Sequence, residues 1–246
     1  MVTNSVGRIA LSVVPGRAEP SDKSEMTTEL LFGEKYEVLE EQSKWMLVKS
    51  IHDNYEAWID RKQHNPLGNN EAETIRLPYL YNIVCSETGE NSILPMSALI
   101  PSNWSFNKLE QEDEVSVQNK LEQTAMRYLG VPYRWGGRSP MGIDCSGFVQ
   151  NVYLNHAVSL PRDAYLQAEV GSTISFVEEV QTGDLAFFDN AEGKIIHVGI
   201  VLKDESKTSI IHASGSVRID AFDHEGIFNS ESNSYSHKLR LIKRLS

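Results

Sequence analysis

The chain is poor in cysteine, and this limits its covalent and metal chemistry. Its 246 residues include only Cys85 and Cys145. Two cysteines in a chain of this length do not form a disulfide framework. The sequence also contains no CxxC or HExxH motif, so a structural zinc site is not expected. We predict neither a metal ion nor another cofactor.

Long apolar runs and basic segments are also absent. The apolar run at residues 9–14 ends at Pro15 and is too short for the apolar region of a signal peptide. The sequence contains no longer apolar run that could span a membrane. We therefore expect a cytoplasmic protein without membrane contact, although a chain from which a signal peptide had been removed would look the same. Lys and Arg number 23 against 34 Asp and Glu, a net charge of −11. This acidic balance argues against nucleic acid or an anionic membrane as partner.

The first half of the chain has the pattern of small β domains. Residues 1–65 contain short β-branched and aromatic runs separated by Gly, Asn, Asp and Ser, which is typical of a small barrel. A turn-rich loop is expected at residues 15–22. Residues 66–112 add strand-like runs at 75–84 and 92–100, with a hairpin turn between them. This second region is either a further small β unit, which we favour, or an extension of the first.

The remainder, residues 113–246, changes pattern and forms the third predicted domain. Apolar residues recur at helical spacing from Val117 to Leu129, and Gly130 and Pro132 then end the helix. Later segments alternate as short strands up to residue 245. Helices followed by an antiparallel meander indicate an α+β domain.

The stretch at residues 142–153 predicts a turn followed by a helix that begins near Cys145. The positive end of a helix dipole favours thiolate over thiol, and the thiolate is the nucleophilic form. Cys145 is therefore a candidate nucleophile, and a small buried core cysteine is the alternative. Cys85 lies in an apolar strand-like run, where a buried, inert thiol is expected.

A nucleophilic cysteine needs a base, and the base needs an orienting partner. His197 opens one predicted strand and His212 closes the next, and residues 203–208 form a polar hairpin between them. On neighbouring antiparallel strands the two imidazoles could lie on one face, with His197 as base and His212 as its partner. The other five histidines show no such context and are expected at the surface: His52, His64, His156, His224 and His237.

Five motifs between residues 116 and 246 occur together in one order. They are YRWGG at 133–137, DCSGFV at 144–149, LPRD at 160–163, GDLAFF at 183–188 and HVGI at 197–200. In order and approximate spacing they resemble the NlpC-type cell-wall cysteine peptidases. The resemblance implies a papain-like fold and cleavage of γ-D-glutamyl bonds in peptidoglycan peptides.

The resemblance also implies roles for individual residues of the C-terminal domain. Cys145 corresponds to the nucleophile, His197 to the base and His212 to the third member. Asp144 and Ser146 flank the nucleophile as substrate-binding residues, and Asp144 would help to hold a substrate amine. Two aromatic residues would line the cleft, namely Tyr133 and Trp135. The Cys145 N–H is a natural oxyanion donor, and the Tyr133 hydroxyl is a possible second donor or only a wall of the cleft.

The N-terminal region resembles the SH3-like domains attached to these enzymes. In their dipeptidyl-peptidase branch, a tyrosine and an acidic side chain of this domain bind the free amine of L-Ala. Tyr55 matches the tyrosine, although Ala57 stands where the family usually has glycine. For the acidic partner we favour Glu25, with Glu19 and Glu29 as rivals and a plain surface glutamate as the alternative.

The resulting expectation is a monomeric recycling peptidase that binds murein peptides. It would remove L-Ala-γ-D-Glu from the diamino acid of released stem peptides, and the third residue could be diaminopimelate or lysine. Two alternatives stay open: a secreted endopeptidase that remodels intact peptidoglycan and, less favoured, a papain-like amidase or acyltransferase that acts on lipids. A non-enzymatic wall-binding module would lack the nucleophile or the base, and both are present.

Overall fold

The computed structural model describes residues 5–68, 72–109 and 120–245. The chain divides into two compact units. The N-terminal unit comprises Met1–Asp113 together with Arg134–Gly142, and the C-terminal unit comprises Glu114–Tyr133 together with Ile143–Ser246. The predicted boundary between residues 65 and 66 lies inside the first unit and stays a prediction.

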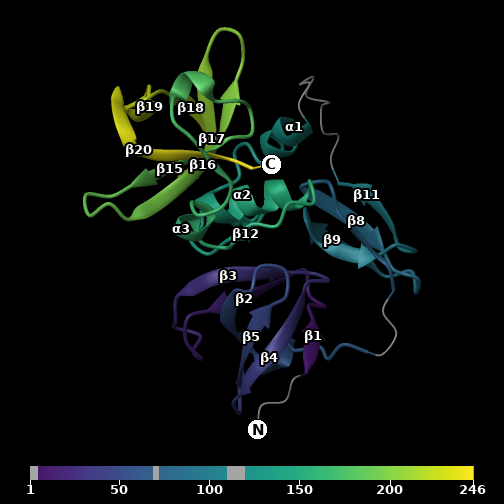
Figure 1. The fold of residues 1–246 in the computed structure, drawn as a ribbon. Coiled ribbons are helices and arrows are strands. Elements are labelled where there is room, and N and C mark those ends of the chain that lie inside the picture. Colours follow the sequence, from purple (N-terminus) through teal and green to yellow (C-terminus); the bar gives the residue numbers. More distant parts are fainter. Residues whose placement is uncertain (1–4, 69–71, 110–119, 246) are drawn as a thin grey trace. The chain divides into compact units, whose positions relative to one another are not determined.

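The N-terminal unit contains a six-stranded antiparallel sheet in the order β1-β4-β5-β6-β2-β3 (Figure 1). Alternate residues of these strands point inward and form an apolar core that includes Val14, Tyr36, Met46 and Ile59. The short 3-10 helix η1 (Arg61–Gln63) follows the last strand. The strands are β1 (Val6–Arg8), β2 (Val13–Arg17), β3 (Met26–Leu31), β4 (Lys35–Glu41), β5 (Trp45–Ser50) and β6 (Glu56–Asp60).

The expected loop at residues 15–22 is partly wrong, because β2 continues through Pro15 to Arg17. Pro15 is opposite Glu29 of β3, and the ladder shifts register after Gly16. A side chain at Gly16 would come within 2.8 Å of the Ala57 side chain. Glycine therefore permits close packing of β2 on β6, and its turn-like composition conceals a strand.

A second group of strands in this unit packs around Leu77, Val84, Leu94 and Ile100. The expected hairpin is present, since β8 pairs with β9 in antiparallel register. Each long run predicted here is interrupted, the first at Pro78, which cannot donate to a ladder. The strands are β7 (Thr74–Arg76), β8 (Tyr81–Cys85), β9 (Asn91–Pro95), β10 (Leu99–Pro101) and β11 (Ser105–Lys108).

Residues 134–142 belong to the N-terminal unit although they are distant from it in sequence. Their strand β12 (Arg138–Ser139) packs against β3. Gly136 has φ of +73°, and a side chain there would come within 2.4 Å of the Met26 carbonyl oxygen. The YRWGG motif therefore needs glycine for this close approach to β3.

The C-terminal unit is built on a seven-stranded antiparallel sheet in the order β14-β20-β15-β16-β17-β18-β19. β19 also pairs with β20, so that six of the strands close on themselves. Its strands are β14 (Ser172–Ile174), β15 (Leu185–Asp189), β16 (Ile195–Lys203), β17 (Thr208–Ser214), β18 (Ser216–Phe222), β19 (Gly226–Asn229) and β20 (Ser234–Arg244).

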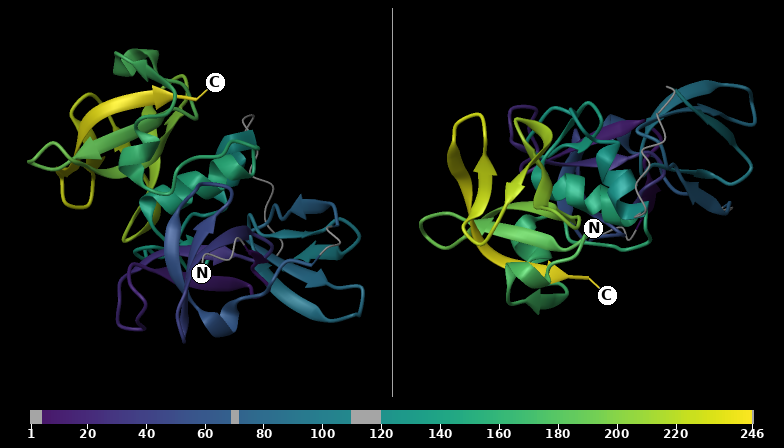
Figure 2. Two further views of the ribbon diagram at one scale, coloured as in Figure 1. Left: turned by 60° about the horizontal axis from the view of Figure 1, so that its bottom comes forward. Right: turned by 90° about the horizontal axis from the view of Figure 1, so that it is seen from above.

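Helix α2 (Cys145–Leu154) packs against β16 and β17 of this sheet (Figure 2). All ten of its residues are buried, as a helix between the sheet and α1 requires. Helix α1 (Lys120–Met126) contacts α2, while the beginning of the predicted helix lies outside the described residues. The short elements are α3 (Ala164–Gln167), η2 (Val177–Glu179) and β13 (Gly142–Ile143). Among the described residues, no helix is both long enough and apolar enough to cross a bilayer.

Candidate active site

Helix α2 begins at Cys145, and Asp144 caps it. The Asp144 backbone is extended, and its Oδ1 accepts a 2.7 Å hydrogen bond from the Gly147 N–H. An aspartate at this position satisfies a helix N–H that has no partner within the helix. The cap fixes where the helix starts, and hence where the cysteine side chain lies.

A buried arginine secures this helix start. Arg162 donates to both carboxylate oxygens of Asp144, at 3.0 and 2.6 Å, and to the Ser146 hydroxyl at 2.9 Å. Arg162, Asp144 and Ser146 are all buried. A bidentate arginine–carboxylate pair is both strong and geometrically specific. The observed contacts of Asp144 are thus those of a capping, ion-paired residue, and its predicted contact with a substrate amine stays a prediction.

The Cys145 side chain is buried, and its electrostatics differ from the sequence expectation. Burial, reinforced by the neighbouring Asp144 carboxylate, raises the pKa of the thiol to about 12. The N–H groups of Val198 and Ser146 and the Arg162 charge act in the opposite direction but do not compensate. The favourable effect of the helix start is therefore outweighed by burial, and Cys145 rests as a thiol. The thiol needs a base to become nucleophilic.

The two predicted histidines lie on adjacent antiparallel strands. His197 is on β16 and His212 on β17, where His212 is paired with Gly199. The His197 Nε2 and His212 Nδ1 atoms are 2.8 Å apart, and both residues are buried. The Cys145 sulfur contacts the N–H of Val198, which directly follows His197 in the chain. The nucleophile and the histidine pair therefore belong to one site.

The HVG sequence is explained by this pairing. A side chain at Gly199 would come within 2.9 Å of the His212 Cβ and within 2.7 Å of Ile210. Real Cβ atoms do not approach so closely in a packed interior. Glycine two residues after His197 therefore leaves room for the His212 side chain.

Burial and the adjacent His212 and His237 hold the pKa of His197 well below its ordinary value. The resting site therefore contains a neutral imidazole and a protonated thiol. A neutral imidazole is the form that can accept the thiol proton. Among the described residues, no three His, Cys, Asp or Glu side chains are placed to hold a metal ion.

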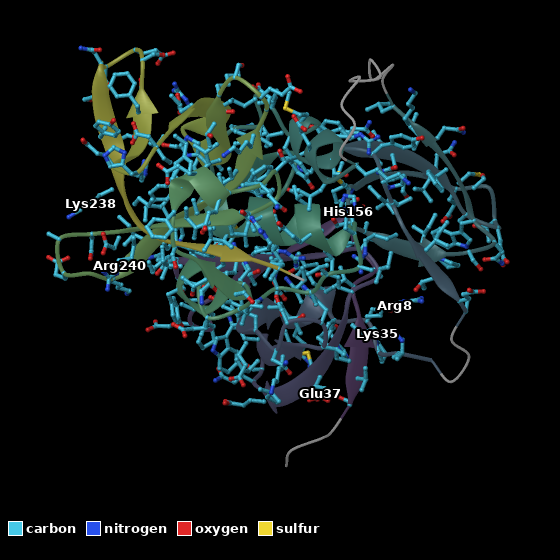
Figure 3. All side chains as sticks on the ribbon, turned by 45° about the horizontal axis from the view of Figure 1, so that its top comes forward. Arg8, Lys35, Glu37, His156, Lys238 and Arg240 are labelled. Carbon is cyan, nitrogen blue, oxygen red and sulfur yellow. The ribbon has the colours of Figure 1, made fainter. Side chains whose placement is uncertain are left out.

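His237 was expected at the surface, and that expectation is wrong. Its ring stacks on His197, with centroids 4.2 Å apart and planes inclined by 24°. Burial, together with His212, lowers the pKa of His237 to about 4, so it is a neutral aromatic neighbour. His156 (Figure 3) is also engaged, through a 3.0 Å contact between its Nε2 and the Thr124 hydroxyl. Of the five histidines that were expected at the surface, His224 is exposed.

Tyr133 lies near the nucleophile, since Cys145 and Asp144 both interact with it electrostatically. Burial and these two groups raise the pKa of the Tyr133 hydroxyl, so it remains a proton donor. Trp135 belongs to the other unit, is 61% exposed and donates through Nε1 to Glu25. Cys85 is half-buried on β8.

The N-terminal unit contains a small cavity of its own. It leaves about 10 Å³ for the centres of water-sized groups, which is room for one such group. Glu29, Asp53 and Tyr55 contribute polar side chains. The full lining is Thr28, Glu29, Leu30, Val48, Ser50, Asp53, Tyr55, Ala57 and Arg138.

Only one of the three glutamates considered from the sequence lines this cavity. Glu29 is buried and accepts from Arg134 through Oε1, while its Oε2 accepts from the Arg138 N–H at 2.8 Å. Glu25 is exposed and contacts Trp135, and Glu19 is exposed as well. The choice of Glu25 is therefore not supported by its surroundings.

Sequence reasoning missed several residues that shape the two sites. Arg162 was recognised only as part of the LPRD motif, and Arg138 and Asp220 received no role. Asp220 lies on β18 and its Oδ2 is 3.0 Å from the His212 Nε2. The signal for it was local: Asp220 follows Arg218 by two residues, so both point to one face of the strand after His212.

Comparison with known proteins gives two family matches. The NlpC/P60 family matches residues 130–237, and a bacterial dipeptidyl-peptidase SH3 domain matches residues 16–63. A dipeptidyl-peptidase 6 of Lysinibacillus sphaericus is 28% identical over 253 residues, covering 85% of this chain and 88% of that protein. A gamma-D-glutamyl-L-lysine dipeptidyl-peptidase of Bacillus subtilis is 32% identical over 202 residues, covering 70% and 68%.

A crystal structure of an NlpC/P60 family protein from Bacillus cereus has a similar fold. It is 21% identical, covers 98% of this chain and 99% of that one, and superposes with a TM-score of 0.77. At this identity the likeness supports the fold, while the family assignment depends on the sequence matches. The resemblance drawn from the five motifs is confirmed: the chain belongs to the NlpC/P60 peptidase family and carries a bacterial dipeptidyl-peptidase SH3 domain.

Proposed function

We propose that the protein is a cysteine peptidase that hydrolyses the γ-D-glutamyl–diamino acid bond of released murein peptides. The products would be L-Ala-γ-D-Glu and the diamino acid or the peptide that it begins. The observation that carries this proposal is the cavity lined by Glu29 and Tyr55, which has room for one ammonium-sized group. The names of the Lysinibacillus sphaericus and Bacillus subtilis relatives support the same activity.

The proposed chemistry begins with proton transfer from the Cys145 thiol to His197. The sulfur then attacks the γ-glutamyl carbonyl carbon, and the amine of the diamino acid leaves with the proton held by His197. Water hydrolyses the resulting thioester and regenerates the thiol. The Cys145 backbone N–H and the Tyr133 hydroxyl are the donors that we assign to the developing oxyanion.

The amine of the N-terminal L-Ala is assigned to Glu29 and Tyr55. A buried carboxylate and an ammonium form a charge-assisted hydrogen bond, roughly twice as strong as a neutral one. Glu29 replaces Glu25 in this role because Glu29 lines the cavity and Glu25 is exposed. An acylated amine has no charge and no longer fits an ammonium-sized space. Peptides still joined to glycan would thus be excluded.

This selectivity suits a cytoplasmic, monomeric enzyme of peptide recycling, which is how we place the protein. A wall-remodelling endopeptidase would accept peptides with a blocked amine. A papain-like amidase or acyltransferase would leave both peptides intact. Selectivity for the free amine therefore separates the three possibilities.

The test is hydrolysis of L-Ala-γ-D-Glu-diaminopimelate, its lysine counterpart and the N-acetylated form of each. We expect cleavage of the free peptides alone, with activity lost in Cys145→Ala and retained in the matched control Cys85→Ala. Equal cleavage of free and acetylated peptides would favour the endopeptidase. If no peptide is cleaved, the proposed function is wrong.

A further inference from the structure

A chain of polar contacts extends behind His197 across three consecutive strands. His197 on β16 is joined to His212 on β17, with 2.8 Å between Nε2 and Nδ1. The other ring nitrogen of His212, Nε2, is 3.0 Å from the Asp220 Oδ2 on β18. His212 is directly opposite Arg218, so Asp220 is its diagonal neighbour on the same face of the sheet.

The carboxylate at the end determines where every proton in this chain lies. An ionised aspartate only accepts hydrogen bonds, so the His212 Nε2 must carry the proton that faces it. In neutral His212 the Nδ1 atom is then an acceptor and requires a proton on the His197 Nε2. The His197 Nδ1 atom is left with a free lone pair, which is what a base for the Cys145 thiol needs.

Asp220 is held in the ionised form that this argument requires. Its hydrogen bond from His212 and its contacts with Arg218 keep the pKa of the carboxyl below its ordinary value, although burial opposes them. The Arg218 Nη2 donates to the Asp220 Oδ1 at 2.9 Å. Asp220 is only 7% exposed. The Arg218 Nε is also 2.8 Å from the Asp220 Oδ2, so the arginine and the imidazole together fix the carboxylate in place.

We propose that Asp220 is a positioning residue that sets the tautomers of His212 and His197, so that the His197 lone pair is available to Cys145. This inference rests on the peptidase activity proposed above and deepens it. Arg218 supports the arrangement by orienting Asp220. The site is thus a line of four side chains, Cys145, His197, His212 and Asp220, in place of three.

Several charged or titratable groups surround His197, and the test must separate their effects. The Arg218 Nη1 is 3.6 Å from the Glu231 Oε2. On the side of the nucleophile lie Asp144, Arg162 and Tyr133. The nearest groups are Cys145 on α2, His212 on β17, Arg218 and Asp220 on β18 and His237 on β20. Because Asp220 and Arg218 have opposite charge, removing each should shift the pH profile in opposite directions.

The kinetic test uses Asp220→Asn and Arg218→Gln on the free tripeptide. Asn offers an amide donor as well as an acceptor, so it no longer enforces one tautomer. We expect kcat to fall at least about 10-fold in Asp220→Asn, with a limit near the roughly 10⁴-fold loss found when the comparable serine-protease carboxylate becomes an amide. KM should change by less than about 2-fold, because the interaction is distant from the bound peptide.

The pH profile distinguishes positioning from simple destabilisation. The acidic limb of kcat/KM reports protonation of the base, His197. It should move to lower pH in Asp220→Asn, which loses an anion, and to higher pH in Arg218→Gln, which loses a cation, by about 0.5 unit or more in each case. The matched control is Asp189→Asn, which removes the same charge from this sheet. Asp189 forms an ion pair with Arg240 (Figure 3) at 3.6 Å.

A second measurement does not depend on the substrate. Long-range ¹H–¹⁵N NMR of the full chain reports which ring nitrogen of each histidine carries the proton. We expect Nε2–H for both His197 and His212 in the wild type and a mixture of tautomers in Asp220→Asn. A proton on the His212 Nδ1 in the wild type would overturn the inference.

The outcomes for the two proposals are distinguishable. If Asp220→Asn matches Asp189→Asn in kcat and in its acidic limb, the positioning role is wrong and the proposed peptidase stands. If the wild type cleaves no tripeptide, the proposed function falls and the tautomers seen by NMR decide the role of Asp220. Should Asp220→Asn fail to fold, the shift in Arg218→Gln and the wild-type NMR spectrum still decide.

Discussion

The assignment of the substrate amine to Glu29 can be tested by Glu29→Gln. The substitution keeps the size of the side chain and removes its charge. A charge-assisted hydrogen bond contributes about 1.5–3 kcal/mol, which corresponds to roughly 10- to 150-fold in kcat/KM for the free tripeptide. The N-acetylated peptide never forms this bond, so any residual hydrolysis of it should stay at the wild-type level. The measured quantity is the ratio of kcat/KM for the two peptides.

The same substitution has a structural cost that must be kept separate. Two donors converge on the Glu29 carboxylate, the Arg134 guanidinium and the Arg138 N–H, and a Gln side chain has one acceptor oxygen to offer them. Leaving one buried donor unsatisfied costs about 1–3 kcal/mol. The Arg134 side chain is 42% exposed and can turn to water, so we expect the lower part of that range. Thermal unfolding of the variant measures this cost independently of the peptide ratio.

Glu25→Gln is the matched control, because it removes the same charge from an exposed side chain immediately before β3. We expect its preference for the free amine to stay within about 2-fold of the wild type, as surface substitutions seldom have larger effects. If Glu25→Gln lost the preference and Glu29→Gln kept it, the amine site would be at Glu25 and the reasoning from the cavity would be refuted.

Three further predictions concern the C-terminal unit. Arg162→Met leaves the buried Asp144 without its ion pair and should lower the free energy of unfolding by about 3–5 kcal/mol, measured by urea unfolding; a loss below about 1 kcal/mol would contradict the buried pair. In the double variant His197→Ala/Cys85→Ala, the rate of Cys145 alkylation by iodoacetamide should rise about 10-fold per pH unit from pH 7 to 10, because a thiol with a pKa of about 12 is largely protonated throughout this range. A plateau of the rate below pH 9 would refute the raised pKa. Gly199→Ala should destabilise by about 1–3 kcal/mol through overpacking against His212, whereas a neutral thermal melt would show that the strands can separate.

Local patterns were sufficient for the centre of the candidate site. The glycine-flanked stretch before an apolar face predicted a helix that begins at Cys145, and α2 begins there. The spacing of His197 and His212 predicted an antiparallel hairpin, and β16 and β17 form it. Both predictions depend on residues less than 20 positions apart, whose geometry follows from the period of a helix or a strand.

Contacts over long sequence separations could not be predicted in this way. The stretch Thr28–Leu31 is buried at four consecutive positions, which breaks the alternation expected of a strand with one solvent face. The reason is that β12, more than 100 residues later, packs against β3 and its Arg138 N–H binds Glu29. His237 likewise reaches His197 only because β20 returns to pair with β15 and β19.

Ion pairing with arginine indicates which acidic residues of this chain are buried and held in place. Within the described part of the chain, five acidic residues are buried, and each carboxylate contacts an arginine. The pairs are Glu29 with Arg134, Glu34 with Arg138, Asp144 with Arg162, Asp184 with Arg244 and Asp220 with Arg218. A buried carboxylate without such a partner would be too costly to keep ionised.

The arginine alone does not distinguish a structural acid from a functional one, and the second partner does. The partners of Asp184 are Arg244 and the Gln181 N–H, and both are groups of the fold itself. Glu29 also lines a cavity, and Asp220 also faces an imidazole. In each of these two, the arginine keeps the carboxylate ionised and in place while a neighbouring group can use its charge. A functional carboxylate in this chain is therefore one that has a ligand space or a proton carrier beside it in addition to its arginine, and Glu29 and Asp220 meet that condition.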